Sequence, residues 1–421
     1  MAEYFLCLTA GGGVPLFYRS KEDSKQLSFP IIGSLNGVHM FANTHDVDLQ
    51  SASTDNTHLV WKVFHNSLTL ILVREKEGSH GTVFLKQHME LLFQAMVLLY
   101  GLEDLMNIKN NERFKREIKV CFNLLDNLLY RSPHYNVSYM ADITLTVDTI
   151  HVPENAILQN YLESFVQTAD SPYGCLLVLG KVAVATTKWW DLTANELVLL
   201  SMLVNTLPRC SSRDIPVFLP HGSPKVPHRL LTFQLVQGVE VCVICGPSPS
   251  LAELEREVER FWRNSYDCLA AVSRAIPRNF PSTINLDQNI LGFALLNTET
   301  HRCLCTVQPS TQENTTQGNI PSTAKRKALL RSFYQYTWES FLNQTNQSEQ
   351  DNQGADATVQ TPTNHSALDI YLCSTSHKCY ALTINHYSLF ILYSTNIPTY
   401  ALKSVSRQTF DILTKEKSII L

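Results

Sequence analysis

The amino-acid sequence predicts an α/β chain of the α+β type, made of three successive units of one architecture. Each unit is expected to contain a mainly antiparallel five-stranded sheet with helices on both faces. The first observation behind this prediction is an order of elements (strand, strand, helix, hairpin, helices) that recurs three times along the chain. The second is the chain length of 421 residues, which three such units fill with little left over. Together they predict three domains in tandem.

In the first unit, EYFLCLT and VPLFYRS flank the turn AGGG and form a hairpin. A helix over residues 31–42 follows, and HLVWKVF and SLTLILV then form a second hairpin over residues 58–73. Two helices close the unit, near residues 82–101 and 107–130. Apolar and polar residues alternate over residues 47–53, which therefore read as a third strand at the edge of the sheet.

The second unit repeats this order. GCLLVL and VAVATT form a hairpin over residues 174–187, and the helix TANELVLLSMLVNTL follows it. Thr193 and Glu196 have the spacing of a capping box, which marks the start of this helix. HRLLTFQLV and VEVCVIC form a hairpin over residues 228–245, and two helical segments end the unit. The Pro-rich stretch 219–230 is expected to be a rigid connecting loop.

In the third unit, ILGFALL pairs with HRCLCTV, and STAKRKALLRSFYQYTWESFL forms the helix. KCYALTI and YSLFILY supply the second hairpin, and a helix near residues 399–414 ends the chain. The polar, low-complexity stretch 343–366 cannot bury apolar surface, so we expect a disordered insert there. The predicted domains are residues 1–139, 140–280 and 281–421.

Composition restricts the function classes. The chain has 34 basic and 38 acidic residues, a net charge of -4, which argues against a general nucleic-acid binder. Eleven cysteines without a recognisable signal peptide favour reduced thiols in the cytosol. The most apolar run, residues 89–105, is shorter than a membrane span requires. We therefore expect a cytoplasmic chain without a transmembrane segment.

The sequence lacks the common signatures of catalysis. It has no G-x-x-x-x-G-K-[ST] phosphate-binding loop. Cys242 and Cys245 lie three apart on an expected strand, so their sulfur atoms point to opposite faces and cannot share a metal. Ser223 lies in the Pro-rich stretch rather than in the G-x-S-x-G elbow of a hydrolase. We predict no catalytic residues, no metal site and no cofactor.

The first predicted helix has an unusual outward face. Helical spacing places one stripe of residues toward the core and leaves two glycines on the opposite side, although each mid-helix glycine costs about 1 kcal/mol relative to alanine. Close approach of another backbone would explain them, and tight packing within this chain is the alternative. The predicted core stripe is Ile31, Leu35, Val38 and Ala42, and the predicted outward face is Gly33, Asn36, Gly37 and Met40.

A dense basic cluster begins the helix of the third unit. It could contact anionic lipid, at about 1 kcal/mol per charge near a membrane surface. The cluster comprises Lys325, Arg326, Lys327 and Arg331.

The order of elements resembles the longin fold, and three in succession resemble the tri-longin Rab exchange-factor family. The strings FPIIGSLNGVHMF, VWKVFHNSLTLILV, LPHGSPKVPHRLLTF and CGPSPSLAELE carry the resemblance closer, to planar cell polarity effectors of that family. It implies a protein of the ciliary base and basal body that pairs with Inturned. With Wdpcp the pair would form a ciliogenesis assembly that engages Rab-type small GTPases.

The resemblance also implies where the partners bind. In tri-longin pairs the first longin domains associate and their first helices face the GTPase, which would use Gly33, Asn36, Gly37 and Met40. The edge strand has no Lys or Pro to protect it, so we expect the first longin domain of Inturned to add a strand there. The edge positions are Val47, Leu49 and Ser51.

An exchange factor performs no covalent chemistry, because it acts by binding the nucleotide-free GTPase better than the loaded one. Two alternatives remain open. One is a membrane-tethering adaptor that binds phosphoinositides through the basic helix. The other is a plain scaffold for ciliary assembly.

Overall fold

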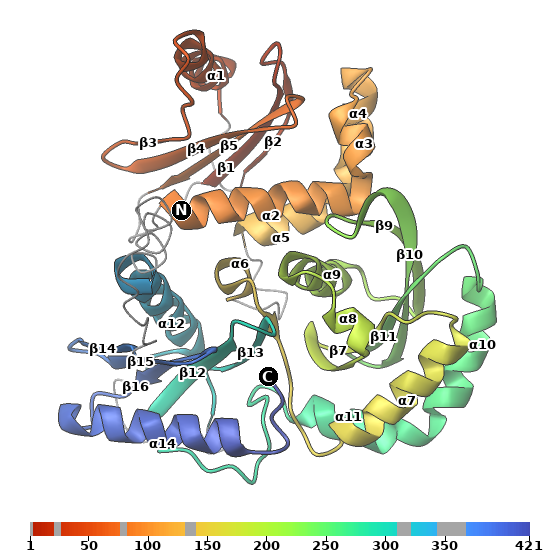
Figure 1. Ribbon diagram of the computed structural model, residues 1–421, viewed down its shortest axis with the longest axis vertical. Helices are drawn as coiled ribbons and strands as arrows, with labels where there is room; N and C mark the ends of the chain where they lie inside the picture. Colours follow the sequence, from red (N-terminus) through yellow and green to blue (C-terminus); the bar gives the residue numbers. More distant parts are fainter. Residues whose placement is uncertain (1–2, 21–26, 76–81, 131–139, 310–320, 343–367) are drawn as a thin grey trace, which may run out of the picture.

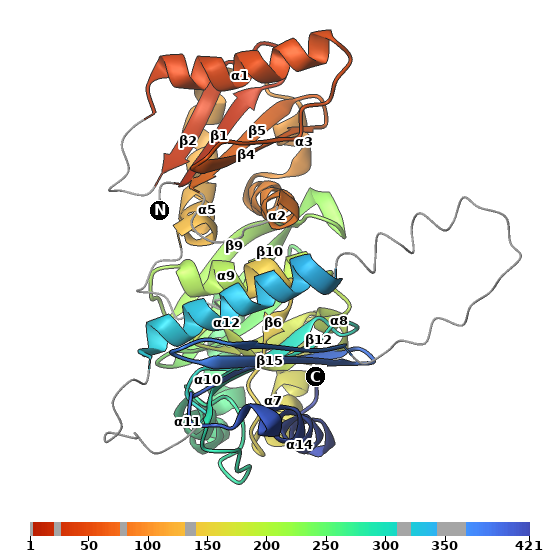
Figure 2. The same cartoon turned by 90° about the vertical axis from the view of Figure 1, so that its left-hand side faces the viewer.

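A computed structural model shows three sheets, each with helices on both faces, and confirms the predicted architecture of three tandem units (Figures 1 and 2). The predicted insert 343–366 lies outside the described residues. The structure describes residues 3–20, 27–75, 82–130, 140–309, 321–342 and 368–421.

The first sheet is antiparallel throughout, with strand order β2-β1-β5-β4-β3. Helix α1 (Phe29–Thr44) covers its outer face. Helices α2 (Thr82–Tyr100) and α5 (Phe122–Tyr130) cover its inner face. The strands are β1 (Glu3–Thr9), β2 (Pro15–Ser20), β3 (Ser51–Ser53), β4 (Thr57–Phe64) and β5 (Leu68–Glu75).

The second long helix predicted for this unit is interrupted. Between α2 and α5 the chain forms α3 (Leu102–Met106), α4 (Asn111–Glu117) and the 3-10 helix η1 (Ile118–Cys121). The Asn110 side chain accepts hydrogen bonds from the backbone N–H groups of Glu112 and Arg113 and so caps α4.

The second sheet has the same order in its own numbering, β8-β7-β11-β10-β9. Helices α8 (Thr187–Trp190) and α9 (Ala194–Thr206) follow its first hairpin, and α9 begins with the predicted capping box of Thr193 and Glu196. The opposite face carries α7 (Asn155–Thr168), α10 (Leu251–Trp262) and α11 (Tyr266–Arg274). The strands are β7 (Gly174–Val178), β8 (Lys181–Ala185), β9 (Ser212–Leu219), β10 (Ser223–Val236) and β11 (Val239–Cys245).

The prediction of a connecting loop over residues 219–230 is wrong. These residues form the tip of the β9–β10 hairpin, and the strand pairing shifts register between Ser223 and His228, where Pro224 and Pro227 lie. The buried carboxylate of Glu196 fixes the turn, because its Oε1 accepts hydrogen bonds from the backbone N–H groups of His221 and Gly222.

The third sheet has six strands, in the order β14-β15-β16-β12-β13-β6. Helix α12 (Thr323–Thr337) covers one face and α14 (Leu402–Lys415) the other. The sixth strand, β6 (Val147–Asp148), pairs in parallel with β13 although it precedes the whole second sheet in the chain. The other strands are β12 (Ile290–Asn297), β13 (Arg302–Thr306), β14 (Leu368–Cys373), β15 (Lys378–Ile384) and β16 (Tyr387–Tyr393).

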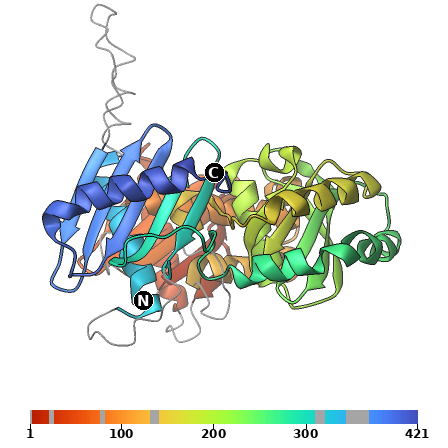
Figure 3. The same cartoon turned by 90° about the horizontal axis from the view of Figure 1, so that it is seen from below.

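The segment that contains β6 joins the second and third sheets, which lie side by side (Figure 3). The backbone N–H of Thr149 donates to Cys303 of β13 at 2.8 Å, and that of Ile150 donates to Val182 of β8 at 3.0 Å. The same segment therefore covers the edges of both β13 and β8, which would otherwise expose unpaired backbone groups.

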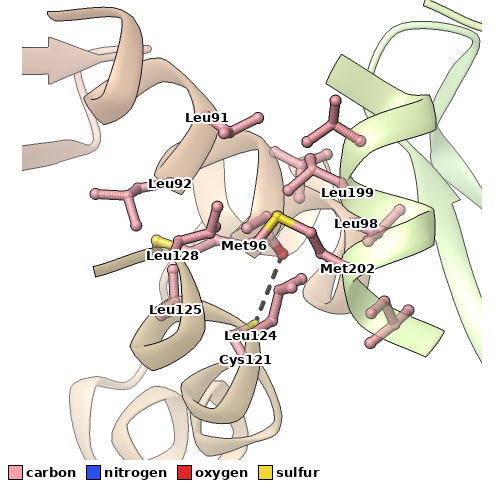
Figure 4. Close-up of a cluster of buried hydrophobic side chains, with 14 of the residues drawn as sticks. Leu91, Leu92, Met96, Leu98, Cys121, Leu124, Leu125, Leu128, Leu199 and Met202 are labelled. Carbon is pink, nitrogen blue, oxygen red and sulfur yellow. Dashed lines mark hydrogen bonds between the residues drawn. The ribbon is translucent and has the colours of Figure 1, made fainter. Parts of the chain in front are cut away.

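A layer of apolar helices joins the first unit to the other two. Side chains of α2 and α5 meet Leu199 and Met202 of α9 in one continuous buried cluster (Figure 4). At one end of α2, the ring centroid of Phe84 lies 4.8 Å from that of Trp338 and 6.3 Å from that of Tyr334. Tyr334 belongs to α12, and Trp338 directly follows this helix. The α2 and α5 contributors include Leu91, Leu92, Met96, Leu98, Leu124, Leu125 and Leu128.

We expect Leu199→Ala to destabilise the first and second units together, by about 2–5 kcal/mol, because the cavity would open in a core that they share. Native-state hydrogen exchange would show faster exchange in α2 as well as in α9. Faster exchange confined to the second unit would contradict a shared core.

Candidate functional site

Helix α1 lies on the outer face of the first sheet, away from the second and third units (Figure 2). It contains no Asp, Glu, Lys or Arg, and within it only Ile32 and His39 are buried. The indole N–H of Trp61 donates a hydrogen bond to the carbonyl of Leu35 and ties the helix to β4. The helix is therefore attached along a narrow stripe.

The predicted core stripe of this helix is wrong in part. Ile31 and Val38, expected to face the core, are exposed, whereas Ile32 and His39 are buried. Leu35 and Ala42 are half-buried, so the buried stripe is rotated around the helix axis by less than one residue step of 100°. Apolar residues occur around the whole helix, so spacing alone did not decide which side the sheet would cover.

The exposed side of the helix is apolar, and we call it the α1 patch. Of the sixteen large apolar side chains exposed in the described part of the chain, six lie within residues 29–47. Phe29 is 74% exposed and Phe41 67%. By contrast, α9 in the second unit buries ten of its thirteen residues. The patch comprises Phe29, Ile31, Val38, Met40 and Phe41, with Val47 beside it.

The two glycines belong to this exposed side. A Cβ atom built on Gly33 or on Gly37 would meet no heavy atom within 4 Å. Tight packing within the chain, the alternative explanation of these glycines, therefore receives no support from the structure. Their lack of a side chain instead lowers the helix surface in the middle of the α1 patch.

Two polar residues of α1 face inward. Asn36, predicted on the outward face, is half-buried and reaches the β1–β2 turn, where a Cβ on Gly13 would lie 1.9 Å from its Nδ2. Burial lowers the pKa of His39, against an opposing effect of Asp48, so the imidazole is held neutral on the sheet side of the helix. Neither side chain adds charge to the patch.

The edge strand is present at the predicted edge but is shorter than predicted. Only Ser51–Ser53 forms β3, and it pairs with β4 alone. Val47 is exposed, whereas Leu49 packs against the cluster between α1 and the sheet.

The free side of β3 can be derived from its hydrogen bonds. Trp61 N donates to Gln50 O at 2.9 Å, and Thr54 N donates to Thr57 O at 2.8 Å. Because bonded and non-bonded pairs alternate in an antiparallel ladder, the backbone groups of Ser51 and Ser53 point away from β4. No described strand pairs with them.

The basic cluster of α12 does not form one surface. Arg331 is only 7% exposed, and its guanidinium donates to both carboxylate oxygens of Asp142, at 2.6 and 2.7 Å. Arg326 donates to the backbone carbonyls of Pro321 and Val307. Lipid contact through Arg331 is therefore excluded by its burial.

The other two lysines of the cluster differ from each other. Lys327 is half-buried, and burial and the neighbouring Lys181 both lower its pKa. Lys325 alone among the four is exposed. The four residues lie within about two turns of one helix, but their charges do not converge on one surface.

The described residues contain no candidate metal site. No group of three or more His, Cys, Asp or Glu side chains in them is arranged to hold a metal ion. Cys242 and Cys245 belong to clusters on opposite faces of the second sheet, as predicted. None of the described helices has the length and apolar character needed to cross a bilayer.

The sequence predicted Gly33, Asn36, Gly37 and Met40 on the outward face but missed the exposed aromatic and branched residues of the α1 patch. The complete absence of acidic and basic residues over Phe29–Thr44 was the signal that could have found them, because a surface helix normally carries charge on its solvated face.

Three family models match the chain, one for each unit. They are described as the first, second and third longin domains of FUZ, MON1 and HPS1, and they cover residues 3–128, 169–263 and 289–417.

Full-length relatives are also similar. The "Protein fuzzy homolog" of Xenopus tropicalis is 42% identical over 415 residues, which is 98% of each chain. The human protein of the same name is 39% identical over 417 residues, 98% of this chain and 97% of the relative, and the mouse protein is 38% identical.

We expect Arg331→Gln to cost about 3–5 kcal/mol of folding stability, because it removes the guanidinium that binds both oxygens of the buried Asp142 carboxylate. Lys325→Gln, at an exposed position of the same helix, should change stability by no more than about 0.5 kcal/mol. Denaturant titration measures both. Unchanged stability of Arg331→Gln together with lost flotation on anionic vesicles would restore the lipid assignment.

Proposed function

Because this chain belongs to the tri-longin family of FUZ, MON1 and HPS1, we propose that it is one subunit of a heterodimer that docks a Rab-type small GTPase and exchanges its nucleotide without covalent chemistry. The division into domains 1–139, 140–280 and 281–421 is part of this proposal. Its site of action is the ciliary base, where the partners are Inturned and Wdpcp.

The observation that carries the proposal is the α1 patch. Three equivalent helices follow the first hairpins of the three units, and the chain itself covers two of them, α9 and α12. The equivalent helix of the first unit, α1, exposes an apolar surface without Asp, Glu, Lys or Arg. An exposed apolar patch of this kind marks a protein interaction site. The open positions Gly33 and Gly37 would let a partner backbone approach, and Met40 can adapt to its shape.

The second element of the proposal is pairing at β3. The outward backbone groups of Ser51 and Ser53 fit an added strand from the first longin domain of Inturned, which would set two first helices side by side. The exposed Val47 extends this contact toward α1.

Release of a fluorescent nucleotide from candidate Rab-type GTPases tests the function directly. The chain together with Inturned should accelerate release. Absence of acceleration with every GTPase would favour the two rival functions, a phosphoinositide-binding tethering adaptor or a scaffold, and vesicle flotation would separate these from each other.

We expect Gly37→Leu to leave the chain folded and to favour α1 locally by up to about 1 kcal/mol. It should nonetheless weaken binding of Inturned or of the GTPase by at least about tenfold, or 1.4 kcal/mol, because leucine fills the lowest part of the patch. Binding titrations measure the change.

A matched control is Ala252→Leu, which adds the same side chain at an exposed position of α10. It should bind both partners normally. Equal binding of both partners by Gly37→Leu and Ala252→Leu would remove the α1 patch from the interface.

Ser51→Pro should prevent association with Inturned while the first unit stays folded. Proline removes an outward N–H, which β4 does not use, and proline is tolerated on edge strands. Ser51→Thr keeps the N–H and should associate normally. Amide exchange gives an independent reading: if residues 51–53 exchange at the same rate with and without Inturned, strand addition at β3 does not occur.

A further inference from the structure

A second open edge lies at the opposite end of the first sheet. Strand β2 pairs with β1, and no other described strand pairs with it. A groove of about 360 Å³ runs along this edge, with Ile32 of α1 on one side and Phe122 of α5 on the other. Between them it is lined by β1, β2 and two lysines, Lys115 and Lys119.

The hydrogen bonds of β1 show which groups of β2 are free. Ala10 N donates to Ser67 O, on the β5 side, whereas Thr9 N donates to Val14 O, on the β2 side. Even-numbered residues of β1 therefore bond toward β5 and odd-numbered residues toward β2. Since Tyr18 lies opposite Leu6, its backbone N–H and C=O point out into the groove. At Tyr18 the groove thus has backbone groups that the pairing of β2 with β1 leaves unused.

The two walls of the groove differ in chemistry. The α1 side is apolar, with Leu6, Leu8 and Ile32 from one buried cluster. The α5 side carries Lys115 and Lys119 beside the ring of Phe122. Successive side chains of an added strand would point alternately to these two walls.

The charge of the lysine side is only partly balanced. Lys115 pairs with Glu112 at 2.9 Å, and Lys119 is exposed and has no ion pair with any described residue. The one charged residue of β2, Arg19, does not block the approach of another strand to this edge. Its side chain hydrogen-bonds to the Asp126 carboxylate, and its guanidinium lies 4.4 Å from the Phe122 ring centroid. The edge is open and its rim is cationic.

We propose that the β2 groove binds an extended segment of another protein in which apolar and acidic residues alternate, added to the sheet as a sixth strand. Backbone hydrogen bonds form at the groups that point outward from β2. The apolar side chains face Leu8 and Ile32, and the acidic ones face Lys119. This site is separate from the proposed pairing at β3, which lies at the other edge of the same sheet.

The cationic rim argues against a second copy of this chain as the occupant. A two-fold pairing of β2 with itself would bring the same lysines of two chains together across the new ladder, and like charges there are destabilising. An acidic partner segment gains from the same charges.

The test uses the full-length chain and a labelled seven-residue peptide of alternating valine and glutamate. We expect fluorescence anisotropy to show that it binds at least about tenfold more tightly than the matching valine–lysine peptide. Methylation of its backbone nitrogens on the bonding edge should abolish binding. Amide exchange at residues 15–20 should slow when the glutamate peptide is present.

Lys119→Glu should reverse the preference between the two peptides, and Lys109→Glu, an exposed position outside the groove, should not change it. Four outcomes would overturn the proposal: no binding of the glutamate peptide, equal binding of the methylated peptide, unchanged exchange over residues 15–20, or a peptide preference that Lys119→Glu leaves intact. Binding that persists when Ser51→Pro has removed pairing at β3 supports two separate edges.

Discussion

The packing of α2 and α5 against α9 is the interaction on which the rest of the molecule depends. These helices share one buried cluster that reaches both the first and the second sheet. Leucine is its most frequent residue, and the burial of each leucine contributes about 1.5–3 kcal/mol. Because the inner face of the first sheet is used in this way, α1 is left on the outside. The outward position of the α1 patch therefore follows from the packing of α2 and α5 against α9.

The three units have one fold but different surroundings. The edges β8 and β13 are joined through residues 147–150, so the second and third sheets support each other. Among the described strands, the first sheet shares no ladder with either of them, and its edge strands β2 and β3 each pair on one side. Its outer helix is apolar and uncovered by the described residues. The proposed binding surfaces thus lie in the unit that meets the second unit through its helices α2, α3 and α5 and not through a shared sheet.

Local sequence signals predicted most of the fold. Alternating apolar runs located the hairpins, and the Thr193–Glu196 pair located the start of α9. What depends on distant contacts could not be predicted: the pairing of Val147 with a strand far along the chain, or the pairing of Arg331 with Asp142. The orientation of α1 was missed for a different reason. A helix that is apolar on every side gives no periodic signal of the side that a sheet will cover.

The leucine-rich surface of α2 and α5 that packs against α9 is exposed for a time during synthesis. The helices α2 and α5 are complete at residue 130, but α9, which covers them, ends only at residue 206. At translation rates of about 5–20 residues per second, the first unit leaves the ribosome with its leucine face uncovered for about 4–15 seconds. During this interval the nascent chain offers chaperones a hydrophobic surface that the finished protein no longer has.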